Sequence, residues 1–340
     1  FVADRCGDRT FDSAKHHLLT EMSRKYDITA IFFDGRGGPP ARGGGKTHQF
    51  YASLGPTIED KEVQLTIQGQ TISSNFGTLD SSQYNLEQLI SSGMFNRIGK
   101  DKLALSEEDR IVLKDLAETS YIAYKDFKNH PMFIPYLERM STLKYYAKTN
   151  IGSRPSKRGK AEGLVFEDLR AIPFVGSWSQ LKQNVPGFFG VGTALKHYED
   201  SNEFEKVQHL FNTSEFFKTL IENSMMSLTK SFLGLTKYMS EDDQYGEFWN
   251  IIYTEYKTSK RLLLKLTGYS QLMEEEPAGK ASIAVRESIV LPLLTIQQFA
   301  LKKIQELEKE PVKDVAKIAI YQKLVMRSLF GNINASRNSA

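Results

Sequence analysis

One glycine- and arginine-rich segment, residues 34–48, holds the residue types best suited to chemistry in this sequence. It reads Asp-Gly-Arg-Gly-Gly-Pro-Pro-Ala-Arg-Gly-Gly-Gly-Lys-Thr-His, with six glycines and three cationic side chains. Glycines permit positive φ angles and let backbone N–H groups converge on an anion. Arginine adds a planar fork of donors that matches phosphate or carboxylate. The segment therefore predicts a binding site for an anionic substrate.

Two alternatives for this segment stay open on composition alone. Gly45-Lys46-Thr47 matches the end of a P-loop, but that consensus requires glycine where Pro40 stands. Proline also lacks the N–H group that a phosphate cradle uses. The second alternative is a flexible surface linker. Linkers favour Gly and Ser, whereas paired arginines in a Gly-Gly frame suit an anion site better.

Three short segments read as buried strands. Residues 28–33 form an apolar run that leads directly into the glycine-rich segment, residues 63–67 alternate apolar with polar side chains, and residues 172–178 form a second apolar run. Apolar runs of this length suit strands covered on both faces, as in a parallel sheet or barrel. Ligands of such folds bind at the carboxyl ends of strands, where residues 34–48 lie.

Most of the remaining sequence reads as helix. Residues 12–26 are expected to form a helix before the first strand, and Ser106-Glu107-Glu108-Asp109 is a capping-box pattern that predicts a helix to about Phe127. From Pro186 onward we expect helices throughout. Helical spacing predicts two further apolar faces, the first on a helix kinked near Pro292. The first face comprises Ile289, Leu293, Ile296, Ala300, Ile304 and Leu307, and the second Ile318, Tyr321, Val325 and Leu329.

Composition excludes several classes of protein. Hydrophobic residues make up 40% and charged residues 25% of the 340 positions, as in soluble globular proteins. A net charge of +3 is too small to argue for nucleic acid or an acidic membrane as the partner. The single cysteine, Cys6, cannot form an internal disulfide, which favours the cytosol. No apolar run approaches the about 18 residues of a membrane helix.

Four motifs in fixed order resemble the carboxyl-terminal part of the phosphoenolpyruvate carboxylases. Residues 33–48 resemble that family's mobile active-site loop, and Gln68-Gly69 resembles its Gln-Gly-Glu segment. Residues 151–158, Ile-Gly-Ser-Arg-Pro-Ser-Lys-Arg, resemble its Gly-Ser-Arg-Pro-Ala-Lys-Arg motif, and residues 169–180 resemble its Leu-Arg-Ala-Ile-Pro-Trp and Trp-Thr-Gln run. Residues 334–340 resemble an ending that carries Arg-Asn-Thr-Gly. The resemblance spans about residues 20–340.

This resemblance implies both a fold and a reaction. The fold is α/β and predominantly helical: residues 1–185 would form the carboxyl-terminal portion of a (β/α)8 TIM-type barrel, and residues 186–340 an appended helical region. The reaction converts phosphoenolpyruvate and bicarbonate to oxaloacetate and phosphate with Mg²⁺ or Mn²⁺. The resemblance further implies a cytoplasmic homo-oligomer, usually a tetramer, that aspartate inhibits. Neither nucleic acid nor a membrane is an expected partner.

The resemblance also implies roles for individual active-site residues. Arg36 and Arg170 match arginines that hold the phosphate of the substrate, with Gly37 and Gly38 in the same loop. Arg42 matches the mobile-loop arginine needed for bicarbonate chemistry, and Arg154 matches another arginine of the cluster. Taken without the resemblance, Arg154 fits a solvated face, and Arg170 fits a structural ion pair beside a buried strand.

Regulatory positions follow from the same resemblance. Lys230, Arg286 and Asn338, together with Arg42, match the positions that bind the inhibitor aspartate. By pattern alone, Lys230 and Arg286 are ordinary helix-surface residues. The hinge freedom of the mobile loop would come from three glycines: Gly43, Gly44 and Gly45.

Several departures from the family pattern accompany the match. Asp34, Gln70 and Ala340 stand where many members have histidine, glutamate and glycine. The family's catalytic histidine and its two carboxylate metal ligands lie upstream of the glycine-rich segment and have no counterpart here. We therefore expect a fragment of a longer product, starting at Phe1 and inactive alone. The alternatives are a non-catalytic module that binds anions and aspartate, or an unrelated phosphate-binding enzyme.

Overall fold

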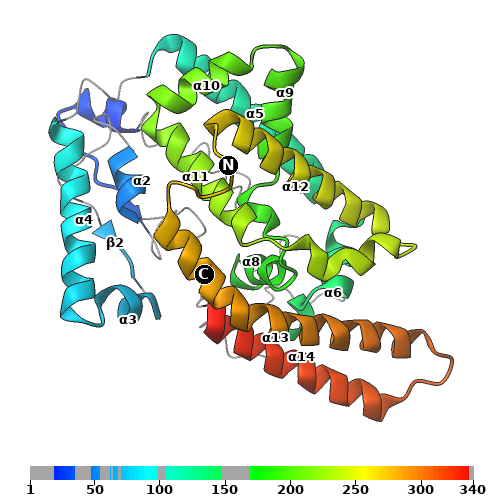
Figure 1. Cartoon of the computed structure of the whole chain (residues 1–340). Helices are drawn as coiled ribbons and strands as arrows, with labels where there is room; N and C mark the ends of the chain where they lie inside the picture. The colour runs from blue at the N-terminus through cyan, green and yellow to red at the C-terminus, as the bar shows by residue number, and fades with distance from the viewer. Residues whose placement is uncertain are drawn as a thin grey trace. The chain divides into compact units, whose positions relative to one another are not determined.

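The computed structural model of the chain describes residues 19–34, 47–53, 62, 64–67, 70–98, 105–146, 169 and 171–336. Helices dominate this part of the chain, as predicted (Figure 1). The chain divides into two compact units, and each is built from three stretches of sequence. The first unit comprises residues 1–124, 187–228 and 257–272, and the second comprises residues 125–186, 229–256 and 273–340. A division at residue 185 into barrel and helical regions stays a prediction.

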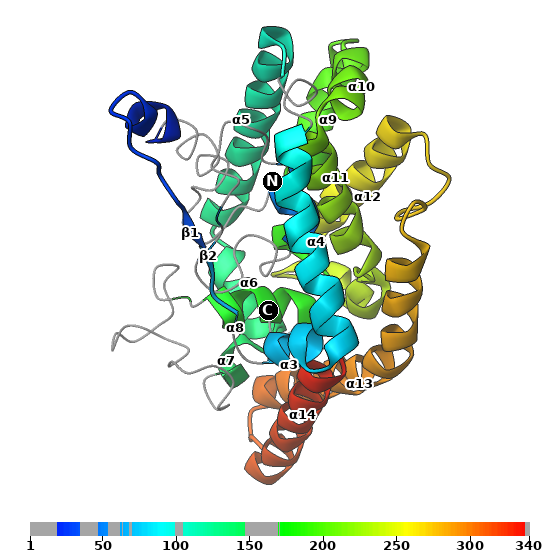
Figure 2. The same ribbon diagram turned by 90° about the vertical axis from the view of Figure 1, so that its left-hand side faces the viewer.

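The first unit contains two very short paired strands and a group of packed helices. Strand β1 (Phe33–Asp34) pairs in parallel with β2 (Gln64–Leu65). Helices α2 (Thr47–Ser53) and α3 (Gln70–Phe76) both pack against α4 (Leu79–Ile98), as Figure 2 shows for α3 and α4. Thr78 caps α4, because its hydroxyl oxygen accepts the backbone N–H of Ser81 at 3.2 Å.

The predicted burial of the first strand is wrong. Residues 28–32 have no regular structure, and only Phe33 of the predicted span lies in β1. Ile28 is 59% exposed and Phe33 is 66% exposed. Burial on both faces requires layers above and below a sheet of several strands. The two paired strands of the described residues supply no such layers, so the apolar side chains remain open.

Two predicted helices are present in the first unit, and one of them begins at the predicted capping residue. Residues 19–24 are helical, within the predicted 12–26. Helix α5 (Glu107–Asn129) begins after Ser106, whose hydroxyl accepts the Asp109 N–H at 3.0 Å, as a capping residue does. The remaining helices of this unit are α9 (Val191–Asp200), α10 (Phe204–Thr213), α11 (Glu215–Thr229, to residue 228) and the second half of α12 (Gly246–Thr267).

Helices α9 and α12 are joined by an exposed ion-pair cluster and a close backbone approach. Glu199 accepts two hydrogen bonds from Arg261, at 2.9 and 2.6 Å, and one from Lys265 at 2.8 Å. These bonds, that to Arg261 first, lower the pKa of Glu199 to about 2. The Gly192 N–H donates to the Ser259 hydroxyl at 2.9 Å. A glycine at this position lets the two helices come within hydrogen-bond distance.

The apolar run at residues 172–178 is a helix, α8 (Ala171–Gln180), and not the predicted strand. Phe174, Ser177, Trp178 and Leu181 are all buried, and their spacing is that of one helix face. Pro173 lies in the first turn, where a helix needs no N–H donor. Short apolar runs do not distinguish a strand from a buried helix by periodicity. The error therefore lies in the secondary structure and not in the prediction of burial.

An aromatic cluster around α8 forms the core of the second unit. It joins Trp178 to helices α5, α6 (Phe133–Met140) and α12. Buried polar groups lie next to the aromatic rings. The Gln183 side-chain amide donates to the Tyr136 hydroxyl at 2.8 Å and to the Thr236 hydroxyl at 3.1 Å. Short helix α7 (Leu143–Tyr146) and 3₁₀ helices η5 (Val185–Gly187, to residue 186 in this unit) and η6 (Leu233–Glu241) complete the surroundings.

Two long helices, α13 (Pro277–Lys309) and α14 (Val315–Ser336), run antiparallel side by side (Figures 1 and 2). The predicted face of α14 is confirmed: Val325 and Leu329 are buried, and the other two members pack against the same cluster. The predicted face of α13 is correct only near its end, since Ile289 is 56% exposed. The buried face includes Gln297 instead, and its side-chain amide donates a hydrogen bond to Gln180. The kink at Pro292 stays a prediction.

Helix α13 is also long and apolar enough, by length and composition alone, for a membrane span, with mean hydropathy 1.2 over its best window. The expectation that no apolar run approaches the length of a membrane helix does not hold for α13 by this measure. Every exposed residue of α13 between Ala281 and Phe299 is uncharged, which explains the high mean hydropathy of this helix. Its packing against α14 gives a second reason for an apolar composition, because the core helix of a helical unit passes the same test.

Candidate functional site

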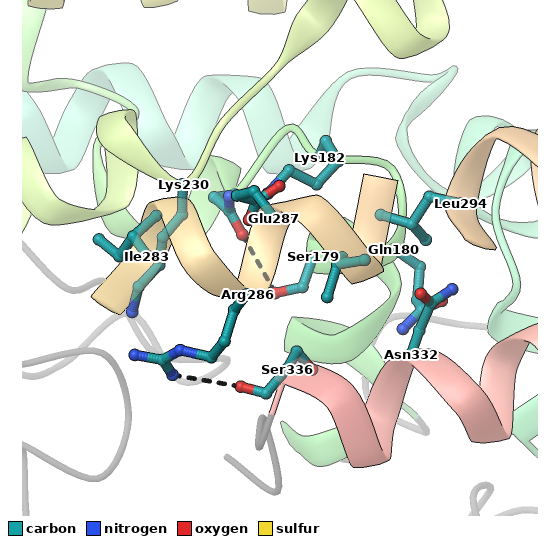
Figure 3. Close-up of a pocket in the computed structure, with 12 residues that line it drawn as sticks. Ser179, Gln180, Lys182, Lys230, Ile283, Arg286, Glu287, Leu294, Asn332 and Ser336 are labelled. Atoms are coloured by element: carbon teal, nitrogen blue, oxygen red, sulfur yellow. Dashed lines mark hydrogen bonds and ion pairs between the residues drawn. The ribbon is translucent and has the colours of Figure 1, made fainter. Parts of the chain in front are cut away.

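A small pocket in the second unit gathers cationic side chains from distant parts of the sequence (Figure 3). The end of α8 and the turn after it, the segment after α11, α13 and the end of α14 all line it. The cavity volume is about 40 Å³, which leaves room for a few water molecules or a carboxylate group. The charged residues of the lining are Lys182, Lys230, Arg286 and Glu287.

The turn after α8 places Lys182 in the pocket with a fixed backbone. Lys182 has a φ angle of 55° and Asn184 has a φ angle of 43°. Both lie in the left-handed region, which residues other than glycine seldom adopt. The Trp178 carbonyl accepts the N–H groups of Gln183 and Asn184, at 3.1 and 3.4 Å. The Lys182 carbonyl accepts the Phe232 N–H at 2.8 Å. These bonds hold the unusual conformation in place.

A buried ion pair joins this turn to α13. The Lys182 Nζ lies 2.5 Å from the Glu287 Oε1, and the two side chains are 6% and 23% exposed. Burial lowers the pKa of Lys182, and the hydrogen bond to Glu287 opposes that shift. The other carboxylate oxygen, Oε2, is buried and has no hydrogen-bond partner within the described residues. The pair therefore leaves one acceptor unused.

Lys230 reaches the same pocket from the segment after α11. Burial lowers the pKa of the Lys230 ammonium, the positive charges of Arg286 and Lys182 lower it further, and Glu287 opposes them. Within the part of the chain that the structure describes, its side chain forms no hydrogen bond and no ion pair. A partly buried ammonium without a close counter-ion is unfavourable, so this position favours an incoming anion.

Arg286 links α13 to the end of α14. Its Nε donates to the Ser282 carbonyl at 3.0 Å, and one Nη donates to the Ser282 hydroxyl at 2.7 Å. The other Nη lies 3.5 Å from the Ser336 carbonyl, in the last turn of α14, where a cation stabilises the helix dipole. Figure 3 shows the Arg286 and Lys230 side chains extending toward the same side of the pocket.

An amide network fixes the opposite side of the pocket. The Gln180 Oε1 accepts hydrogen bonds from Gln297 at 3.0 Å and from Asn332 at 3.2 Å. All three side chains are buried, and each comes from a different helix: α8, α13 and α14. Because unsatisfied buried amides are costly, the network sets the position of α14 relative to α8.

The pocket's charges suit an anion and not a metal ion. Three cationic side chains face one carboxylate, which leaves a formal excess of two positive charges. Magnesium and manganese prefer several oxygen ligands, whereas the one carboxylate here, Glu287, is already paired with Lys182. No group of three or more potential metal ligands occurs among the described residues. These residues therefore do not fit the divalent metal that the resemblance implies.

Of the predicted site residues, the structure brings two together: Lys230 and Arg286. The other predicted positions lie outside the described residues, so their convergence stays a prediction. They are Arg36, Gly37, Gly38, Arg42, Gly43, Gly44, Gly45, Arg154, Arg170 and Asn338.

Sequence reasoning missed Lys182 and Glu287. No local signal marked Lys182, because most of its neighbours between Trp178 and Val185 are polar.

The comparison with known families identifies one family model that matches most of the chain. The family model described as phosphoenolpyruvate carboxylase matches residues 12–336. The matched range includes both predicted effector residues that line the pocket and the four motifs that precede residue 181. Because the match covers nearly the whole chain, this protein belongs to the phosphoenolpyruvate carboxylase family.

Proposed function

We propose that this chain is the carboxyl-terminal part of an enzyme that converts phosphoenolpyruvate and bicarbonate to oxaloacetate and phosphate. We also propose that the pocket of Lys230 and Arg286 binds aspartate as an inhibitor. One observation carries this proposal: two residues distant in sequence, both expected at an effector site, line one pocket with an excess of two positive charges. Aspartate carries two carboxylates and one ammonium group, so its net charge is opposite in sign to that excess.

The chemical step would rely on four arginines, Arg36, Arg42, Arg154 and Arg170. Transfer of phosphate from an enol oxygen to bicarbonate spreads negative charge over the phosphoryl oxygens, and fixed guanidinium groups stabilise that charge. Closure of residues 34–48 over the site, with hinge freedom from its glycines, would exclude water and retain carbon dioxide. The divalent metal of the family would need ligands beyond the described residues.

Inhibition would follow from competition for the mobile-loop arginine. Aspartate held by Lys230, Arg286 and the Asn338 amide would also bind Arg42 through a free carboxylate oxygen. Arg42 would then be withdrawn from the substrate, and the loop would stay open. Arg286 would supply the planar pair of N–H donors that binds a carboxylate best.

Replacing Arg286 with alanine tests the effector site. We expect the dissociation constant for L-aspartate to rise by about 10- to 150-fold, since hydrogen bonds to charged groups contribute about 1.5–3 kcal/mol. Isothermal titration calorimetry of the wild-type and Arg286→Ala chains measures this change. Arg261→Ala, which removes an exposed arginine of α12 in the other unit, is the matched control and should bind aspartate normally. Equal affinities for wild type and Arg286→Ala would contradict the proposal.

A polypeptide of these 340 residues is expected to form no oxaloacetate by itself. The resemblance assigns the catalytic histidine and two carboxylate metal ligands to sequence upstream of residue 34. In a coupled assay with saturating substrates and Mg²⁺, any oxaloacetate formed is reduced at the expense of NADH. The fall in NADH absorbance measures the rate. A rate above the enzyme-free blank would refute this expectation.

A non-catalytic anion-binding module is the second candidate function. It is favoured by one observation: the charged lining of the pocket comes from the second unit alone, so anion binding needs no barrel. Adding the upstream portion of a family member in trans distinguishes the two. Oxaloacetate formation in the mixture supports the enzyme, and aspartate binding without activity in the mixture supports the module.

A further inference from the structure

We propose that Lys182 is a third cationic ligand of this pocket and that Glu287 is a built-in competitor for the bound anion. In the structure Glu287 neutralises Lys182 at 2.5 Å. When an anion binds, Lys182 exchanges the Glu287 carboxylate for the carboxylate of the ligand. This inference rests on the proposed anion site and adds to it the residues that set its affinity.

The position of Lys182 is the first support. Most lysines have flexible side chains on exposed helices, whereas Lys182 projects from a turn held in a left-handed conformation by three backbone hydrogen bonds. Its side chain is only 6% exposed. Unfavourable backbone conformations persist where the surrounding structure holds them, and they concentrate at functional sites. The fixed backbone places the ammonium group in the pocket without the entropy loss of ordering a surface lysine.

A purely structural ion pair is the simpler explanation, and two observations disagree with it. The Glu287 Oε2 is buried without a partner in the described residues, so the pair with Lys182 does not use the whole carboxylate. In addition, Glu287 influences Lys230, whose pKa it raises against the effects of burial and Arg286. The Glu287 carboxylate is thus paired with Lys182 and also favours the charged form of Lys230.

The charge balance gives the direction of the effect. Three cations and one carboxylate leave two positive charges, enough for one dicarboxylate. Glu287 repels such a ligand and also occupies Lys182. Glutamine has nearly the same shape, and its amide oxygen still accepts a hydrogen bond from Lys182. The change Glu287→Gln therefore removes the repulsion, makes Lys182 available and raises the positive excess to three.

The test uses L-aspartate as the probe and calorimetric titration of four chains: wild type, Glu287→Gln, Lys182→Gln and the double variant. We expect Glu287→Gln to bind about 10- to 100-fold more tightly than wild type, the range that removing one nearby charge gives at an intermediate dielectric. Lys182→Gln should bind about tenfold more weakly. The double variant should bind at least about tenfold more weakly than Glu287→Gln, because Lys182 no longer contacts the ligand.

The results that would overturn the inference are specific. If Glu287→Gln and the double variant bind aspartate equally and differ only in melting temperature, Lys182 is structural. If Glu287→Gln binds no more tightly than wild type, Glu287 is not a competitor. Should Glu287→Gln fail to fold, Glu287→Asp replaces it: this change keeps the charge but shortens the side chain, and unchanged affinity would then reject the inference.

Failure of this inference and failure of the proposed function have different signatures. Aspartate binding by wild type that is lost in Arg286→Ala, with Glu287→Gln equal to wild type, rejects the competitor and keeps the effector site. No binding by wild type, but clear binding by Glu287→Gln, supports the competitor and rejects aspartate as the natural inhibitor. No binding by any of the chains rejects both.

Discussion

Replacing Trp178 with alanine is expected to lower the free energy of unfolding by about 4–5 kcal/mol, near the upper end for a buried aromatic residue. Trp178 is fully buried, and four rings lie around it within 6.4 Å between centroids: Phe127, Phe133, Tyr136 and Phe174. Removing the indole leaves a cavity that these rings, which come from three helices, cannot fill without shifting. Urea unfolding followed by far-UV circular dichroism measures the change.

The conservative change Trp178→Phe separates packing from hydrogen bonding. The Trp178 Nε1 donates to no acceptor within the described residues, so phenylalanine removes volume alone and should cost about 1–2 kcal/mol. Trp249 provides the contrast, since its Nε1 donates to the Thr236 hydroxyl at 3.1 Å. Trp249→Phe should cost more than Trp178→Phe, because the buried Thr236 hydroxyl loses one of the two hydrogen bonds that it accepts. Equal losses from Trp178→Phe and Trp178→Ala would show that the N–H group matters and would contradict this account.

The sequence predicted helices best where local signals and tertiary packing agree. The capping pattern at Ser106 fixed the start of α5, since the same hydroxyl that the pattern singles out accepts the Asp109 N–H. The apolar spacing of α14 was sufficient for the same reason: Val325 and Leu329 face a core of apolar neighbours. Both signals lie within one or two turns of helix, and they need no information from elsewhere in the chain.

Prediction was weaker where packing decides. Residues 172–178 are as apolar as a strand, and only the rings packed against Trp178 require a helix there. On α13 the spacing rule counted apolar residues and so selected Ile289, which is exposed, over Gln297, which is fully buried. A buried glutamine depends on a partner amide 117 positions away, at Gln180. No local pattern contains that information.

The candidate site was predictable only through the family resemblance, and then only in part. Lys230 and Arg286 have no distinctive local pattern, and their shared pocket results from the fold of the second unit. Lys182 and Glu287 are 105 positions apart. Neither belongs to a recognised motif, because the role of each depends on burial and on the charge of the other. The positive charge of this pocket is a property of tertiary structure.

The last prediction concerns the contact of α9 with α12 in the first unit. Gly192→Ala is expected to lower the free energy of unfolding by about 2–3 kcal/mol, as overpacking of a close contact does. A Cβ atom at residue 192 would lie 2.6 Å from the Ser259 backbone nitrogen and 2.7 Å from its hydroxyl oxygen. Because the nearest atom belongs to the backbone of α12, the two helices must separate. Thermal unfolding and urea titration measure the loss.

Gly187 is the matched control, because its neighbour can be removed. A Cβ atom there would meet the Ser227 side chain, with Oγ at 2.1 Å and Cβ at 2.5 Å, whereas the Ser227 Cα is 3.9 Å away. Ser227→Gly should therefore rescue most of the loss caused by Gly187→Ala, apart from the roughly 0.5–1 kcal/mol that glycine costs within a helix. Ser259→Gly should not rescue Gly192→Ala, since the backbone nitrogen remains. Rescue of both pairs would mean that side chains alone set the spacing of α9 and α12.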